Sequence, residues 1–236
     1  MNSKISMNSI SPSTLDLQTL ITSNDIQTNI ENFNKLVETA KNYRNALCLI
    51  SDAASEFGSA LEEVAKTKGS HNSGEGLMNA AGLQFLIANH DQILSKSIKQ
   101  NFEIPIREKI NDFKKDAILN DLKFKQLIRE KLINLKKREK EINKFSKLKT
   151  KNLMTYKTNL LSLTSQLDEI DKLKHDFYLS SFELVQDFSQ EILNHSGLVV
   201  RSQLEISEAI AKKGWSGGGL ENLIANYGDP FSGLLD

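Results

Sequence analysis

The sequence predicts an all-α protein: an elongated antiparallel three-helix rod of coiled-coil type that dimerises into a six-helix centre. From Leu83 to Ser196 there is no glycine and only one proline, Pro105. Strands would need turn residues every ~8 to 12 positions, so this stretch favours long helices. Apolar residues also recur at alternating spacings of four and three, which is the pattern of a coiled-coil stripe. Helices of this length bury little core on their own, and three-helix rods with a surplus of apolar surface usually dimerise.

The first helix is expected over residues 25–66, where the apolar stripe runs from Ile26 to Val64. Residues 1–24 before it form a Ser-, Asn- and Thr-rich tail that we expect to be weakly structured. After it, the segment TKGSHNSGEG, Thr67–Gly76, has three glycines and little to bury. This segment predicts a flexible connection to the next helix.

The second and third helices are expected over residues 78–146 and 153–213, together with the first forming one domain over 25–213. Pro105 lies inside the second helix and predicts a kink, because proline removes one backbone donor and crowds the preceding turn. The two helices are similar in length and joined by a short connection, so they should pair as an antiparallel hairpin. Gly214 predicts the end of the third helix. Residues 214–236 form a Gly-rich extension, which we interpret as a regulatory or partner-binding element.

Positive charge is concentrated in one stretch of a chain whose formal net charge is zero. Lys123–Lys151 contains twelve basic and three acidic residues, a local net charge of +9, so the other 207 residues sum to −9. This asymmetry predicts a surface for a polyanion, placed at the far end of the hairpin. The candidate lipid-binding residues are Lys123, Lys125, Arg129, Lys131, Lys136, Lys137, Arg138, Lys140, Lys144, Lys147, Lys149 and Lys151.

Several features indicate a peripheral rather than a membrane-spanning protein. No stretch approaches the ~18 to 20 apolar residues that span a bilayer, and the N-terminus has no apolar signal region. The single cysteine, Cys48, lies in the apolar run ALCLI. It is best interpreted as a buried residue in a reducing compartment, with the cytosolic side as the default.

Other functions are less favoured by the residues. The basic stretch has ten Lys to two Arg, and its aromatics Phe124 and Phe145 fall on the apolar stripe, which disfavours nucleic-acid binding. Asp171 with His175 and Glu191 with His195 lack the Glu-x-x-His spacing of bundle metal sites, so we expect no metal, cofactor or enzymatic activity. A coiled-coil scaffold or tether without direct lipid binding remains an alternative.

Two segments resemble the BAR superfamily: FGSALEEVAKTKG, Phe57–Gly69, and AAGLQFLIANHDQILSKSIKQNFEIPI, Ala80–Ile106. They look most like fungal inverse-BAR (I-BAR) phospholipid-binding proteins of the vacuolar membrane. The resemblance implies a homodimer that binds anionic phospholipids, phosphoinositides among them, and senses or generates membrane curvature without a chemical step. It also implies a peripheral location on the vacuolar or endolysosomal membrane, with a Rab GTPase and a tethering-complex subunit as partners.

The dimer is expected to form where the first helix overlaps the hairpin. Its candidate interface residues are Phe57, Leu61, Leu83, Leu86, Ile87, Ile93 and Leu94.

Overall fold

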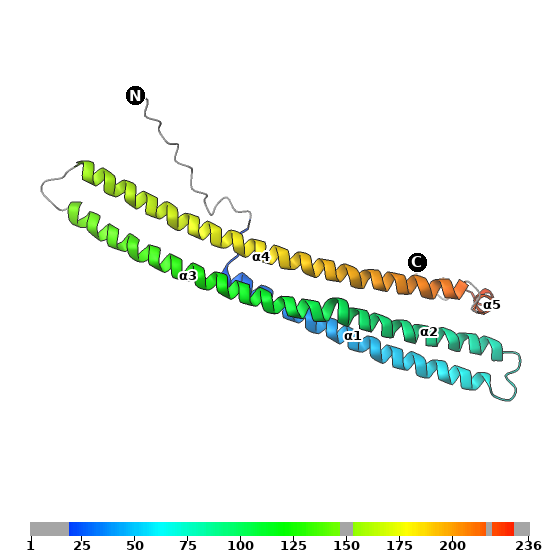
Figure 1. The fold of residues 1–236 in the computed structure, drawn as a ribbon. Coiled ribbons are helices and arrows are strands. Elements are labelled where there is room, and N and C mark those ends of the chain that lie inside the picture. The colour runs from blue at the N-terminus through cyan, green and yellow to red at the C-terminus, as the bar shows by residue number, and fades with distance from the viewer. Residues whose placement is uncertain (1–18, 147–152, 216–218, 229–236) are drawn as a thin grey trace, which may run out of the picture. The chain divides into compact units, whose positions relative to one another are not determined.

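The computed structural model describes residues 19–146, 153–215 and 219–228, and within these ranges it contains helices and no strand. The elements are α1 (Ser23–Ala65), α2 (Gly74–Ile98), the π-helical turn η2 (Lys99–Glu103), α3 (Ile104–Ser146), α4 (Leu153–Trp215) and the short α5 (Glu221–Ala225) (Figure 1). The predicted all-α class is confirmed. The described chain divides into two compact units. The first contains the residues up to Phe33 and Lys109–Ser189; the second contains Asn34–Glu108 and the residues from Gln190 onward.

Helix α1 begins at Ser23, two residues before the expected position, because Thr22 and Asp25 cap it reciprocally. The Thr22 hydroxyl and backbone N–H donate to Asp25 Oδ2 at 2.7 and 2.8 Å. The Asp25 N–H donates back to Thr22 Oγ1 at 3.3 Å. This is the geometry of a capping box, and it satisfies backbone donors that have no partner inside the helix. The hydroxyl bond, then the backbone bond, lowers the pKa of Asp25.

In the first unit, α3 and α4 pair side by side as an antiparallel hairpin, as predicted from the sequence (Figure 1). Four contacts fix their register, and each step toward the end of α3 is matched by an equal step back along α4. These contacts are Phe113 with Phe188 (ring centroids 5.1 Å apart), Asn120 Nδ2 with Ser180 Oγ (2.9 Å), Phe124 with Phe177 (stacked at 4.1 Å) and Lys131 Nζ with Glu169 Oε2 (2.6 Å).

The start of α1 covers only part of this hairpin. The Phe33 ring lies 5.4 Å from that of Phe113 and 4.5 Å from that of Phe188, measured between centroids. Ser23 Oγ donates to Asp121 Oδ1 at 3.0 Å. Because α1 begins here and α3 continues to Ser146, the rest of α3 is paired with α4 alone within the described part of this unit.

In the second unit, α1 packs closely against α2. Ser51 Oγ donates to the Ala88 carbonyl at 2.7 Å. Gly58 allows the close approach, because a Cβ there would lie 2.9 Å from the Phe85 ring and 3.2 Å from the Ala81 carbonyl oxygen. The core cluster is formed by Leu47, Leu94 and Ile98, with Val199 and Ile206 of α4 packed against it.

A π-helical turn stands where the sequence predicted a kink. Proline at 105 has no N–H to donate to the carbonyl four residues earlier, that of Asn101. The ring of His195, on α4, supplies a donor instead: its Nδ1 lies 2.5 Å from the Asn101 oxygen. Since a carbonyl can only accept, His195 must carry its proton on Nδ1 in this contact. The turn η2 is therefore stabilised by a side chain from another helix.

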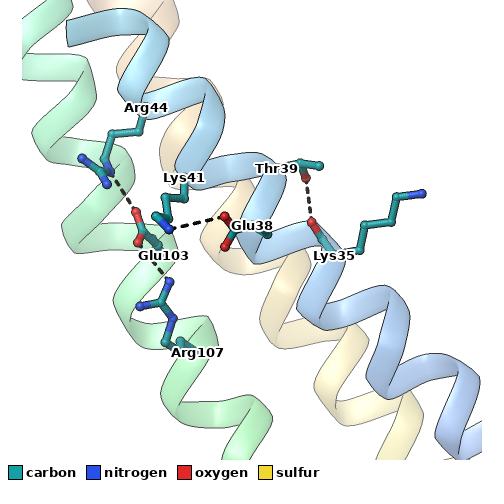
Figure 2. A network of polar contacts seen from close by, with 7 residues as sticks. All are labelled: Lys35, Glu38, Thr39, Lys41, Arg44, Glu103 and Arg107. Carbon is teal, nitrogen blue, oxygen red and sulfur yellow. Dashed lines mark hydrogen bonds and ion pairs between the residues drawn. The ribbon is translucent and has the colours of Figure 1, made fainter.

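Glu103, the last residue of η2, is buried between two arginines (Figure 2). Arg44 Nε of α1 lies 2.8 Å from Glu103 Oε2, and Arg107 Nη2 lies 3.1 Å from Glu103 Oε1. Each carboxylate oxygen thus has its own cationic donor, which offsets the cost of burying the charge.

The C-terminal extension folds back in part onto the start of α2. Asn79 Nδ2 donates to the Gly219 carbonyl at 3.0 Å, and Leu220 is buried. Gly219 has a φ of 74°, a conformation that other residues rarely adopt. The predicted regulatory role of this extension stays a prediction.

The contact between His195 and Asn101 predicts a specific non-additivity. We expect His195→Ala to lower the free energy of unfolding by about 1 to 2 kcal/mol, because it leaves a carbonyl without its donor. In a Pro105→Ala background the restored N–H can serve that carbonyl, so the same change should cost less. Urea denaturation of the wild type, the two single variants and the double variant measures this double-mutant cycle. Equal costs of His195→Ala in both backgrounds would contradict this account, and His71→Ala, at an exposed position, is the control.

Glu103 should be far more important for stability than an exposed carboxylate in a similar pair. Glu103→Ala leaves two arginines without their shared anion, and we expect a loss of about 3 kcal/mol. Glu38→Ala removes the exposed pair with Lys41, whose side chains are 58% and 40% exposed, and should cost under about 1 kcal/mol. Urea denaturation compares the two. Similar losses in the free energy of unfolding would show that the buried pairs of Glu103 contribute no more than the exposed one.

Candidate functional site

The predicted basic residues lie in the first unit, on the half of α3 beyond Asp121. Nine of the twelve are described, while Lys147, Lys149 and Lys151 fall outside the described residues. Lys131 and Arg138 are half-buried. The exposed members are Lys123, Lys125, Arg129, Lys136, Lys137, Lys140 and Lys144.

Three of these nine cations have an acidic partner. Lys125 pairs with Asp121 at 2.6 Å, and Lys131 bridges to Glu169 of α4 at 2.6 Å. Arg138 lies 3.6 Å from Glu141. The other six, Lys123, Arg129, Lys136, Lys137, Lys140 and Lys144, form no ion pair with any residue that the structure describes. Their charge is available to an external anion.

The helical period brings most of the unpaired cations to one side of α3. Leu135 is 8% exposed and marks the side that faces α4. Spacings of three and four residues put Lys137, Lys140 and Lys144 together on the opposite side. We call the set Arg129, Lys136, Lys137, Lys140 and Lys144 the cationic face. Its last members lie in the final turns of α3, where the helix dipole favours positive side chains.

Apolar side chains, which the count of charges does not predict, interrupt this face. Leu132 is 42% exposed and Ile133 is 60% exposed. With Arg129 and Lys136 they border a hollow of about 480 Å³, which Lys125 and Ile128 complete. The signal was present, because the apolar stripe passes from Ile128 to Leu135 and neither Leu132 nor Ile133 belongs to it.

The predicted interface residues are all in the second unit, with different exposures. Phe57 and Ile93 are 55% and 45% exposed, and Leu61, Leu83, Leu86 and Ile87 are half-buried. Leu94 is buried in the unit's own core and has little surface left for a partner. Exposed neighbours on α1 and α2 extend the apolar surface; they are Leu49, Ile50, Val64, Met78 and Phe85.

The residues that the structure describes offer no assembled metal centre. Among them there is no group of three or more His, Cys, Asp or Glu side chains that could hold a metal ion. His195 is occupied by the Asn101 carbonyl, and half-buried Cys48 lies 3.1 Å from Ser95 Oγ. In the same part of the chain, no helix has the length and apolar character needed to cross a bilayer.

Comparison with known proteins gives consistent results for sequence and fold. Residues 18–184 match the family model of the IRSp53/MIM homology domain, IMD. The chain is 38% identical over 222 residues to Protein IVY1 of Saccharomyces cerevisiae, covering 94% of this chain and 49% of that protein. It thus spans about half the length of this relative.

Among solved structures, the fold is similar to the N-terminal I-BAR domain of IBARa from D. discoideum. The TM-score is 0.69 at 17% sequence identity, over 86% of this chain and 87% of that one. At this identity the likeness concerns the fold alone. The family model matches most of the chain and, in agreement with the yeast relative and the fold, shows that the chain belongs to the I-BAR (IRSp53/MIM homology domain) family.

Proposed function

We propose that this chain is a peripheral membrane protein that binds anionic phospholipids, phosphoinositides among them, through the cationic face of α3. The observation that carries the proposal is the set of cations on this face that have no acidic partner within the described residues. I-BAR domains as a family bind membrane lipids and dimerise. The proposal extends this behaviour to a defined surface of this chain.

The electrostatics of the face support binding without an enclosed pocket. Each Lys or Arg near an anionic membrane contributes about 1 kcal/mol, so five cations can hold a protein at the surface. A homodimer presents the face twice, and the second contact is strengthened because it is intramolecular. The Debye length is only ~8 Å at physiological ionic strength, so the attraction acts at short range and weakens with added salt.

The apolar surface of the second unit supports the dimer. Leu49 is 70% exposed and Phe57 is 55% exposed on α1, with Ile93 of α2 at 45%. Large apolar side chains exposed on two neighbouring helices are typical of a protein–protein contact. We propose that a second copy of this chain covers them.

We also propose that the protein senses or generates membrane curvature. We place it on the vacuolar or endolysosomal membrane, with a Rab GTPase and a tethering-complex subunit as partners. Support for the membrane and the partners comes from the resemblance of the segments Phe57–Gly69 and Ala80–Ile106 to fungal vacuolar I-BAR proteins. Membership of the I-BAR family supports the role in curvature.

Charge reversal on the cationic face should abolish lipid binding. In co-sedimentation with vesicles containing phosphatidylserine or a phosphoinositide, we expect Lys136, Lys137, Lys140 and Lys144 changed to Glu to reduce binding by more than about tenfold at low salt. Neutral vesicles should bind neither protein, and high salt should weaken the wild type. A control variant with Lys68, Lys96, Lys99 and Lys213 of the second unit changed to Glu has the same net charge. The proposal fails if the wild type does not bind at low salt, or if both variants lose binding equally.

The dimer is tested by placing charge on its apolar surface. Phe57→Glu with Ile93→Glu should shift the mass measured by sedimentation equilibrium from dimer to monomer, since two unpaired charges would be desolvated. Ile118→Glu, at a 60% exposed position of the first unit, is the control and should leave the mass unchanged. A dimer that survives the double substitution would place the interface elsewhere.

A further inference from the structure

We infer that the hollow on α3 is a binding site for one anionic phospholipid, in which Arg129 and Lys136 hold the phosphate while Leu132 and Ile133 contact the acyl chains. The inference rests on the proposed function. It goes further because it adds a salt-resistant apolar contact to a surface that is otherwise electrostatic, and assigns that contact to two residues.

The helical period places the cations and the apolar side chains of the hollow in neighbouring rows along α3. Lys125, Arg129 and Lys136 are spaced by four and seven residues and so form one row along α3. Leu132 and Ile128 lie on the side of this row that leads to the core, and Ile133 lies on its other side. Arg129 and Lys136 therefore have apolar side chains on both sides, Ile128 and Leu132 on one and Ile133 on the other, which suits a phosphate held beside hydrocarbon.

The apolar residues of the hollow are exposed to solvent. Leu132 and Ile133 are 42% and 60% exposed. Removing such aliphatic surface from water is favourable, so a partner that covers it would be stabilised. No third helix of this unit covers them in the described structure, because α1 begins at Ser23, beside Asp121. Their surface is thus open to an apolar partner.

Charge selects the partner. Arg129 and Lys136 have no acidic partner among the described residues, so an anion satisfies them, and the guanidinium fork of an arginine matches a phosphate well. A free phosphate would leave Leu132 and Ile133 in water. A membrane offers both chemistries at once, since Lys and Arg stems lie along apolar surface while their charged ends reach headgroups.

The first test separates apolar from electrostatic binding. Co-sedimentation with vesicles of phosphatidylcholine and phosphatidylserine is measured at 0.1 and 0.5 M NaCl. We expect Leu132→Ser with Ile133→Ser to lower the partition coefficient about tenfold at both salt concentrations, because apolar contact does not depend on screening. Charge reversal at Lys136 and Lys137 should matter mainly at low salt. The matched control is Leu167→Ser on α4, which is 46% exposed and followed by Asp168 and Asp171.

The second test locates the contact directly. Ile133→Trp is made with Trp215→Phe, so that the only tryptophan reports from the hollow. Lipids brominated on their acyl chains should quench its fluorescence on binding. Leu167→Trp in the same background is the control and should stay unquenched.

The outcomes distinguish the inference from the proposed function. If the wild type does not bind vesicles at low salt, both fail. If it binds, but the serine variant matches the wild type and the tryptophan at 133 is not quenched, only the inference fails. If the hollow takes a second copy of this chain, the serine variant will lower the oligomeric mass without vesicles and leave lipid binding unchanged, which also overturns the inference.

Discussion

The antiparallel register of α3 against α4 is the constraint on which the candidate site depends. Stacking of Phe124 on Phe177, at 4.1 Å between centroids, and the bridge from Lys131 to Glu169 hold one side of α3 against its neighbour. Aromatic pairs of this kind add about 0.5 to 1.5 kcal/mol beyond their buried area. Since α3 is a regular helix, fixing the side that carries Phe124 and Leu135 also fixes where Lys137, Lys140 and Lys144 point. The core of the hairpin therefore orients the cations.

The second unit shows how a local defect is compensated by tertiary contacts. Pro105 withholds a backbone donor, the chain forms a π-helical turn, and the ring of His195 donates to the Asn101 carbonyl. The same turn places Glu103 between Arg44 and Arg107, where its buried charge is neutralised. Buried polar groups are rarely left without partners, so a helix interrupted by proline persists where its neighbours supply the missing bonds.

Sequence reasoning predicted the helices well because their signal is periodic and long. The stripe from Ile26 to Val64 and the absence of glycine from Leu83 to Ser196 were sufficient for the fold class. Contacts made across helices had no such signal: the partner of His195 and the burial of Leu94 depend on which helix faces which. The cations of the site followed from charge counting, and the position of Leu132 and Ile133 off the apolar stripe indicates their exposure, but the hollow that they border required the structure. A stripe identifies the residues that face a neighbour, but the structure shows where that neighbour ends.

A surface that combines cations with exposed apolar side chains has properties that neither kind of side chain has alone. Screened charges attract a membrane within ~8 Å and tolerate many orientations, because the energy depends weakly on where each cation sits. Apolar side chains gain nothing until they touch hydrocarbon, and then depend strongly on depth. On the cationic face, Arg129 and Lys136 would bring the helix to the surface, and Leu132 and Ile133 would set its rotation there. The rotation of α3 determines how the rest of the unit meets the bilayer. Two aliphatic residues among cations would thus convert a general attraction into a defined orientation.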